Sequence, residues 1–105
     1  MPDKRIVKIY EVIPNKRKKL IADSVNIVLF GVQIWVISED YKQNFRFEDT
    51  TAITVLGRNK ANIYHKGKIY QLKGEKGFNA LKYVHFYNRF MNLTRGDGNG
   101  KFLGL

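Results

Sequence analysis

The sequence contains no cysteine, and this absence excludes several kinds of chemistry. A disulfide framework, a thiolate nucleophile and a zinc site with sulfur ligands all require cysteine. Only two histidines are present, His65 and His85, and neither has a carboxylate near it in the sequence. The pairs and triads that mark acid–base or nucleophilic catalysis are absent. We therefore expect no metal, no cofactor and no enzymatic activity.

Long apolar runs are also missing. The most apolar segment, 25–37, is interrupted by Asn26 and Gln33 and is shorter than the roughly 20 residues that span a bilayer. The first ten residues lack the apolar centre of a signal peptide. We expect a cytoplasmic protein, peripheral at the membrane if it contacts one. A length of 105 residues predicts one domain.

Acidic residues are few, with 9 Asp and Glu against 19 Lys and Arg, so the formal net charge is +10. A charge of this size predicts attraction to polyanions, namely nucleic acid, an anionic membrane surface or an acidic protein face. The basic residues are spread over the whole chain, so solubility alone explains the excess equally well.

The first two thirds of the chain alternate between apolar and polar residues with a period of two, which is typical of strands. Lys66-Gly67 separates two such segments and predicts a tight hairpin, because glycine tolerates a positive φ. About seven short strands at regular spacing are typical of a small barrel or sandwich. The predicted strands are 5–13, 19–30, 32–39, 42–48, 51–57, 60–65 and 68–73.

The period then changes, and an amphipathic helix is predicted over 75–92, with Gly74 and Glu75 at its start. Its apolar face is expected to bury against the strands. We therefore expect a domain over 1–93, followed by a flexible, glycine-rich tail with an apolar end over 94–105. The residues of the predicted apolar face are Ala80, Tyr83, Val84, Tyr87, Phe90 and Met91.

The segment 45–90, "FRFEDTTAITVLGRNKANIYHKGKIYQLKGEKGFNALKYVHFYNRF", resembles the closing half of a pleckstrin-homology-like domain, including the GRAM-type and bacterial forms. The resemblance lies in the order of elements, not in a residue motif. It implies a mainly β fold, a partly open barrel of about seven antiparallel strands capped by one C-terminal amphipathic helix. The chain departs from the family in its helix, which lacks the tryptophan often seen in eukaryotic members. The only tryptophan, Trp35, falls in a strand.

The most concentrated charge lies between the first two predicted strands, in "PNKRKK" at 14–19. The guanidinium of Arg17 suits phosphate, and the neighbouring lysines add point charges. In ligand-binding members of the family, the loop between the first two strands holds anionic headgroups, and the 65–68 hairpin lies at the same open end. Glu39 and Asp40 are expected at that rim too, where they would repel phosphate. The predicted anion- or lipid-binding residues are Lys16, Arg17, Lys18, Lys19, Lys66 and Lys68.

The sequence therefore predicts a non-enzymatic binding or targeting module that engages an anionic membrane surface or a phosphorylated headgroup through its basic first hairpin. One alternative is a protein-interaction module that binds a peptide or an acidic partner at a sheet edge or beside the helix. A nucleic-acid-binding small barrel is the less favoured alternative. Its stacking platforms would have to come from strand aromatics that core packing already explains.

Overall fold

A computed structural model describes the backbone of residues 6–95 and the side chains of residues 6–92. Seven strands precede one C-terminal helix, as expected for a mainly β fold. A short 3₁₀ helix, η1, separates the fourth and fifth strands. The elements are β1 (Ile6–Val12), β2 (Lys19–Phe30), β3 (Gln33–Ile37), β4 (Lys42–Arg46), η1 (Phe47–Asp49), β5 (Thr50–Leu56), β6 (Lys60–His65), β7 (Lys68–Gly74) and α1 (Ala80–Arg95).

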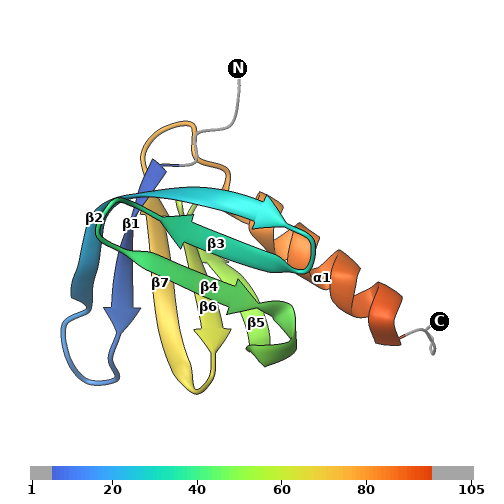
Figure 1. The fold of residues 1–105 in the computed structure, drawn as a ribbon. Coiled ribbons are helices and arrows are strands. Elements are labelled where there is room, and N and C mark those ends of the chain that lie inside the picture. Colours follow the sequence, from blue (N-terminus) through green and yellow to red (C-terminus); the bar gives the residue numbers. More distant parts are fainter. Residues whose placement is uncertain (1–5, 96–105) are drawn as a thin grey trace.

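The seven strands form one antiparallel sheet in the order β4-β3-β2-β1-β7-β6-β5. β1 lies at its centre and pairs with both β2 and β7. β4 and β5 are consecutive in the chain but lie at opposite edges of the sheet, and η1 makes the corner between them. The sheet curls until these two edges approach each other, which gives the predicted partly open barrel (Figure 1).

Apolar and polar residues alternate along each strand, and the apolar ones form the core. Val7 and Ile9 of β1 are buried while Lys8 between them is exposed. The same pattern recurs in β3, where Ile34 and Val36 are fully buried. Successive side chains of a strand point to opposite faces, so these residues fill the inner face of the curled sheet. Polar residues fall on its outer face.

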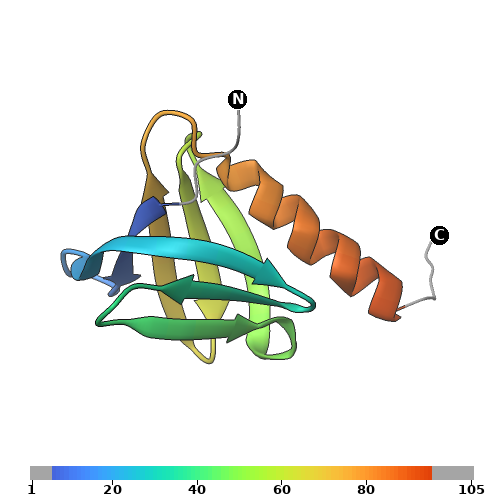
Figure 2. The same ribbon diagram turned by 45° about the horizontal axis from the view of Figure 1, so that its top comes forward.

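β2 is the longest strand, and it bends. Its pairing with β1 shifts register on both sides of Ile9, so that Val7 faces Val25 while Ile9 faces Ala22. Such irregularities increase the local bend and twist of a strand. The bend allows β2 to pair with β1 at its start and with β3 at its end, and it turns the β2–β3–β4 half across the β7–β6–β5 half (Figure 2).

α1 packs against β5 and β6, and Phe47 of η1 anchors it. The Phe47 ring is fully buried and lies 5.1–5.5 Å, centroid to centroid, from the rings of Phe86, Tyr87 and Phe90. The Tyr87 hydroxyl also donates a hydrogen bond to the carbonyl oxygen of Thr50. The predicted apolar face of the helix is therefore the buried one. Phe45 and Phe47 are both fully buried, but Phe47 belongs to η1 and not to the strand predicted over 42–48.

The helix begins at Ala80, five residues later than predicted. Residues 75–79 form a turn instead, in which the Phe78 amide bonds the Glu75 carbonyl and Gly77 has a φ of 102°. Asn79, a residue type favoured immediately before a helix, precedes Ala80. The buried Phe78 ring packs on Gly74, which explains why the chain leaves β7 through a turn. Of the predicted tail 94–105, residues 94 and 95 end α1, and the others lie outside the described residues.

A Gly74→Ala variant tests this contact. A Cβ at residue 74 would overlap the Phe78 ring, so we expect the free energy of unfolding to fall by about 1–3 kcal/mol in urea denaturation. In a Phe78→Ala background the same substitution should cost clearly less, because the two side chains would no longer collide. An equal cost in both backgrounds would contradict the contact.

Candidate anion-binding site

The basic cluster lies in the β1–β2 hairpin, at one end of the sheet. After β1, Pro14 and Asn15 turn the chain, with Asn15 at a φ of 63° and the Lys16 amide donating to the Ile13 carbonyl. This turn brings four consecutive basic side chains into solvent. Within residues 6–92 none of them forms an ion pair with a carboxylate. The four residues are Lys16, Arg17, Lys18 and Lys19.

The β6–β7 hairpin lies beside this cluster. Val12, at the end of β1, pairs with Ile69 near the start of β7, so the two turns share one end of the sheet. Lys66 and Gly67 both have a positive φ, 49° and 79°, as a tight two-residue hairpin requires. The tight turn predicted from Lys66-Gly67 is therefore confirmed. Lys66 and Lys68 are both exposed there.

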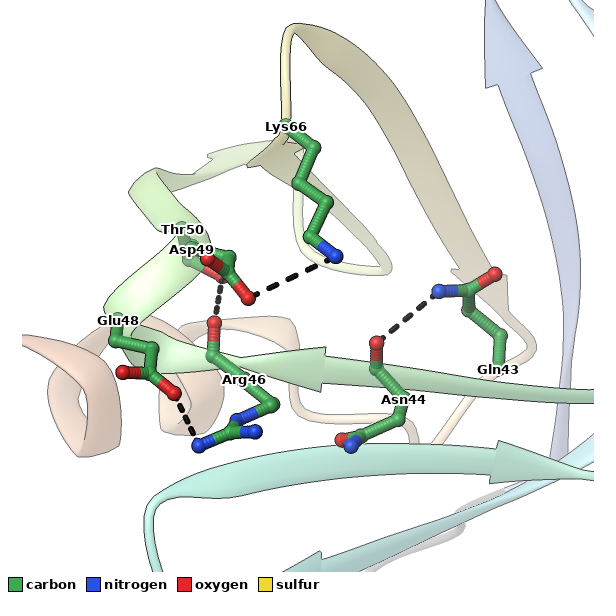
Figure 3. A network of polar contacts seen from close by, with 7 residues as sticks. All are labelled: Gln43, Asn44, Arg46, Glu48, Asp49, Thr50 and Lys66. Atoms are coloured by element: carbon green, nitrogen blue, oxygen red, sulfur yellow. Dashed lines mark hydrogen bonds and ion pairs between the residues drawn. The ribbon is translucent and has the colours of Figure 1, made fainter.

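Carboxylates of the η1 corner offset part of the charge at this end. The Lys66 ammonium lies 3.9 Å from the Asp49 carboxylate (Figure 3). The Lys66 amide also donates to the Asp49 carbonyl oxygen. Arg46 pairs with Glu48 in the same network. Of the two predicted site lysines in this hairpin, Lys66 and Lys68, it is therefore Lys66 that has a carboxylate partner within residues 6–92.

The acidic loop after β3 faces the first half of β2. Glu39 and Asp40 border a hollow of about 480 Å³ whose other side runs from Ile21 to Ser24. Their expected repulsion of phosphate stays a prediction. The carboxylate that faces a predicted site lysine is that of Asp49.

Lys18 does not point away from the domain as its neighbours do. Its ammonium donates to the Gln71 side-chain oxygen at 2.7 Å and lies 4.4 Å from the centre of the Tyr10 ring. Gln71 in turn donates to the Asn62 side chain at 3.0 Å. Lys18 therefore folds back from the hairpin onto the outer face of β1, β7 and β6.

Two further lysines lie near that position. Partial burial lowers the pKa of Lys18, and the charges of Lys60 and Lys73 lower it further. Neither Lys60 nor Lys73 was among the predicted site residues. The sequence does carry a signal for them, because a two-residue turn at 66–67 places residue 60 directly opposite residue 73.

A buried histidine, His65, ends β6 immediately before the Lys66-Gly67 turn. The His65 ring lies 5.2 Å from Phe45 and 6.4 Å from Tyr70, and its Nε2 atom has no hydrogen-bond partner within the described part of the chain. Burial lowers the pKa of His65, the charge of Lys66 lowers it further, and Asp49 partly opposes both. His85 lies on the exposed side of α1. Among residues 6–92 no cluster of His, Asp and Glu side chains has the arrangement of a metal site.

A second hollow, of about 370 Å³, lies between the end of β2 and α1. Leu29 and Phe86 form its apolar part, and basic side chains surround them. The neighbouring β2–β3 turn exposes Phe30 and Val32, at 66% and 46% of their surface. The basic side chains that line this hollow are Lys82, His85 and Arg89.

No protein-family model, curated protein or solved structure matches this chain. The fold and the site therefore rest on the residues themselves. In the part of the chain that the structure describes, no helix has the length and apolar character needed to cross a membrane.

The buried histidine predicts a pH dependence of stability. The pKa of His65 in the folded state is below the unfolded value of 6.5. As the pH falls, His65 therefore binds a proton in the unfolded state before it does so in the folded state, and this favours unfolding. The contribution of neutral His65 to the free energy of unfolding should be complete above pH 6.5 and should be lost as the pH falls through the folded pKa. We expect a His65→Gln variant to lose this part of the slope in urea denaturation. His85→Gln, which changes an exposed histidine, should keep it, and equal slopes in both variants would contradict the assignment.

Proposed function

We propose that the protein is a non-enzymatic binding or targeting module that engages an anionic membrane surface or a phosphorylated headgroup through the β1–β2 hairpin. The observation that carries the proposal is the exposure of four consecutive basic residues in the β1–β2 hairpin, of which Lys18 folds back onto the outer face and Lys19 begins β2. None of them has a carboxylate partner within residues 6–92. The backbone turn holds these charges together, so they act on one region of a bound surface.

The strength of such a contact can be estimated. Each basic residue near an anionic bilayer contributes about 1 kcal/mol, and salt screens the contribution within about 10 Å. Four to six residues therefore give a weak, salt-sensitive attachment. A stable association needs a second anchor, such as another domain or an additional contact surface.

The resemblance to pleckstrin-homology-like domains stays a prediction. Two features support it, the seven-stranded curled antiparallel sheet and the helix that follows the last strand. In that family the first hairpin is the ligand loop, and here the first hairpin is also the most basic exposed segment. Lys68 beside it adds a charge, while Asp49 partly offsets that of Lys66.

A protein-interaction module is the second candidate, and the hollow beside α1 favours it. An apolar floor made by Leu29 and Phe86, with basic side chains around it, suits an acidic peptide that carries an apolar residue. Nucleic-acid binding is less favoured, because base stacking requires an open aromatic face. On the basic face, the Lys18 ammonium already lies over the Tyr10 ring.

Vesicle co-sedimentation tests the proposed function. The protein should bind vesicles of phosphatidylcholine mixed with phosphatidylglycerol and should not bind pure phosphatidylcholine. Replacing Lys16 and Arg17 together by alanine should weaken binding about 30-fold at low salt, since two charges are lost. Binding of the unchanged protein should fall steeply on raising salt to the physiological level.

A control variant removes the same charge from α1. Lys82 and Arg89 lie on the helix, where they line the hollow beside the end of β2. Their replacement by alanine should change vesicle binding by about threefold or less. Equal losses in the two double variants would mean that net charge alone attracts the protein, and the hairpin would then not be a site.

A further inference from the structure

Three lysines form a row across the outer face of the sheet. Lys8 of β1 is directly opposite Lys73 of β7, and Lys73 is directly opposite Lys60 of β6. Each lies at an outward position of its strand: Lys8 is between the buried residues Val7 and Ile9, Lys73 follows the buried Leu72, and Lys60 precedes the buried Ala61. Neighbouring strands are about 4.8 Å apart, so the row spans roughly 10 Å. Lys18 reaches the same face from the hairpin and contacts Gln71, which pairs with Asn62 and lies two residues before Lys73.

Repulsion between these lysines lowers the stability of the folded state. Like charges directly across a strand pair destabilise a sheet, and this row contains two such pairs. Within residues 6–92 one carboxylate pairs with the row, that of Asp23, which is 3.5 Å from the Lys8 ammonium at the end next to β2. Lys60 and Lys73 have no such partner in that range. Burial is the main cause of the lowered pKa of Lys18, and the charges of Lys60 and Lys73 lower it further.

The side chains that border the row are aliphatic. Leu56 of β5 is directly opposite Lys60 and is 54% exposed. Ile6, two residues before Lys8 on the same side of β1, is 64% exposed. Basic side chains interspersed with exposed aliphatic ones are suited to the headgroup region of a bilayer, where the cations meet phosphate and the aliphatic groups leave water.

We propose that this outer face, defined by Lys8, Lys18, Lys60 and Lys73, is a second contact with the anionic bilayer. The inference rests on the proposed function and adds the orientation of the domain. The protein lies with the outer face of β1, β7 and β6 against the lipid headgroups, and the β1–β2 hairpin extends the same surface. Lys18 belongs to both parts because it starts in the hairpin and ends over Gln71.

The β6–β7 turn at the open end, which carries Lys66 and Lys68, is the competing contact surface. There Asp49 faces Lys66, and Glu48 lies in the same corner, so carboxylates would approach the headgroups together with the lysines. The outer face carries four lysines and one paired aspartate. Charge complementarity therefore favours the outer face for a bilayer of anionic lipid.

Two charge-matched double variants separate the two orientations. Lys60→Gln with Lys73→Gln removes two charges from the outer face, and Lys66→Gln with Lys68→Gln removes two from the open end. On vesicles of phosphatidylcholine mixed with phosphatidylglycerol, the first should weaken binding roughly 30-fold at low salt. The second should weaken it only about fivefold, because Lys66 already has a carboxylate partner and the charge of Lys68 is the one lost.

Thermal unfolding gives a readout that is independent of lipid. Since the row repels itself, the outer-face variant should unfold at a higher temperature than the unchanged protein at low salt, and the difference should shrink as salt rises. A higher unfolding temperature would also show that the variant is folded, so its loss of binding would not be caused by unfolding. An unfolding temperature that is unchanged or lower would contradict the repulsion from which the inference starts.

The binding outcomes are distinct. If the outer-face variant binds like the unchanged protein while the open-end variant loses binding, the side-on orientation is wrong and the proposed function stands. If the unchanged protein does not bind anionic vesicles, both the side-on orientation and the proposed function are wrong. Binding of a single-stranded oligonucleotide that depends on Lys60 and Lys73, without vesicle binding, would also overturn the inference and would assign the face to nucleic acid.

Discussion

The rest of the structure depends on the pairing of β1 on both of its edges. β1 hydrogen-bonds β2 on one side and β7 on the other, so it joins the two halves of the sheet into one. Its alternation also divides the domain chemically. Val7 and Ile9 enter the core, whereas Lys8 and Tyr10 face outward, where Lys73 and Gln71 of β7 are their partners. The strand that closes the core therefore also organises the basic outer face.

A second constraint acts at the corner between β4 and β5, the two edges of the sheet. Phe47 lies in η1 at that corner and packs against three aromatic rings of α1. The helix thus covers the region where strand pairing ends, and burying an apolar face there removes the exposed edge that a half-open barrel would leave. Because the corner also holds Glu48 and Asp49, it places carboxylates beside the β6–β7 turn, whereas Lys60 and Lys73 on the outer face have no carboxylate partner within residues 6–92.

Much of the fold follows from local patterns in the sequence. The alternation predicts all seven strands within a few residues, and Lys66-Gly67 fixes the register of β6 against β7. The start of α1 could not be read from periodicity, because the contact of Phe78 with Gly74 is tertiary and keeps 75–79 out of the helix. The hairpin cluster is visible as a run of four basic letters. Lys60 and Lys73 are separated in the sequence, and Lys8 joins them only through the pairing of β1 with β7, which no local pattern specifies.

The most direct measurement of the central claim is a nuclear magnetic resonance titration of the ¹⁵N-labelled protein with bicelles that contain phosphatidylglycerol. We expect the largest changes in amide signals on the β1–β2 hairpin and on Lys8, Lys60, Gln71 and Lys73, and we expect them to disappear as salt is added. Changes centred on Asp49, Lys66 and Gly67, with the outer face unaffected, would contradict the side-on contact. Changes confined to α1 and the end of β2 would instead favour the protein-interaction site beside the helix.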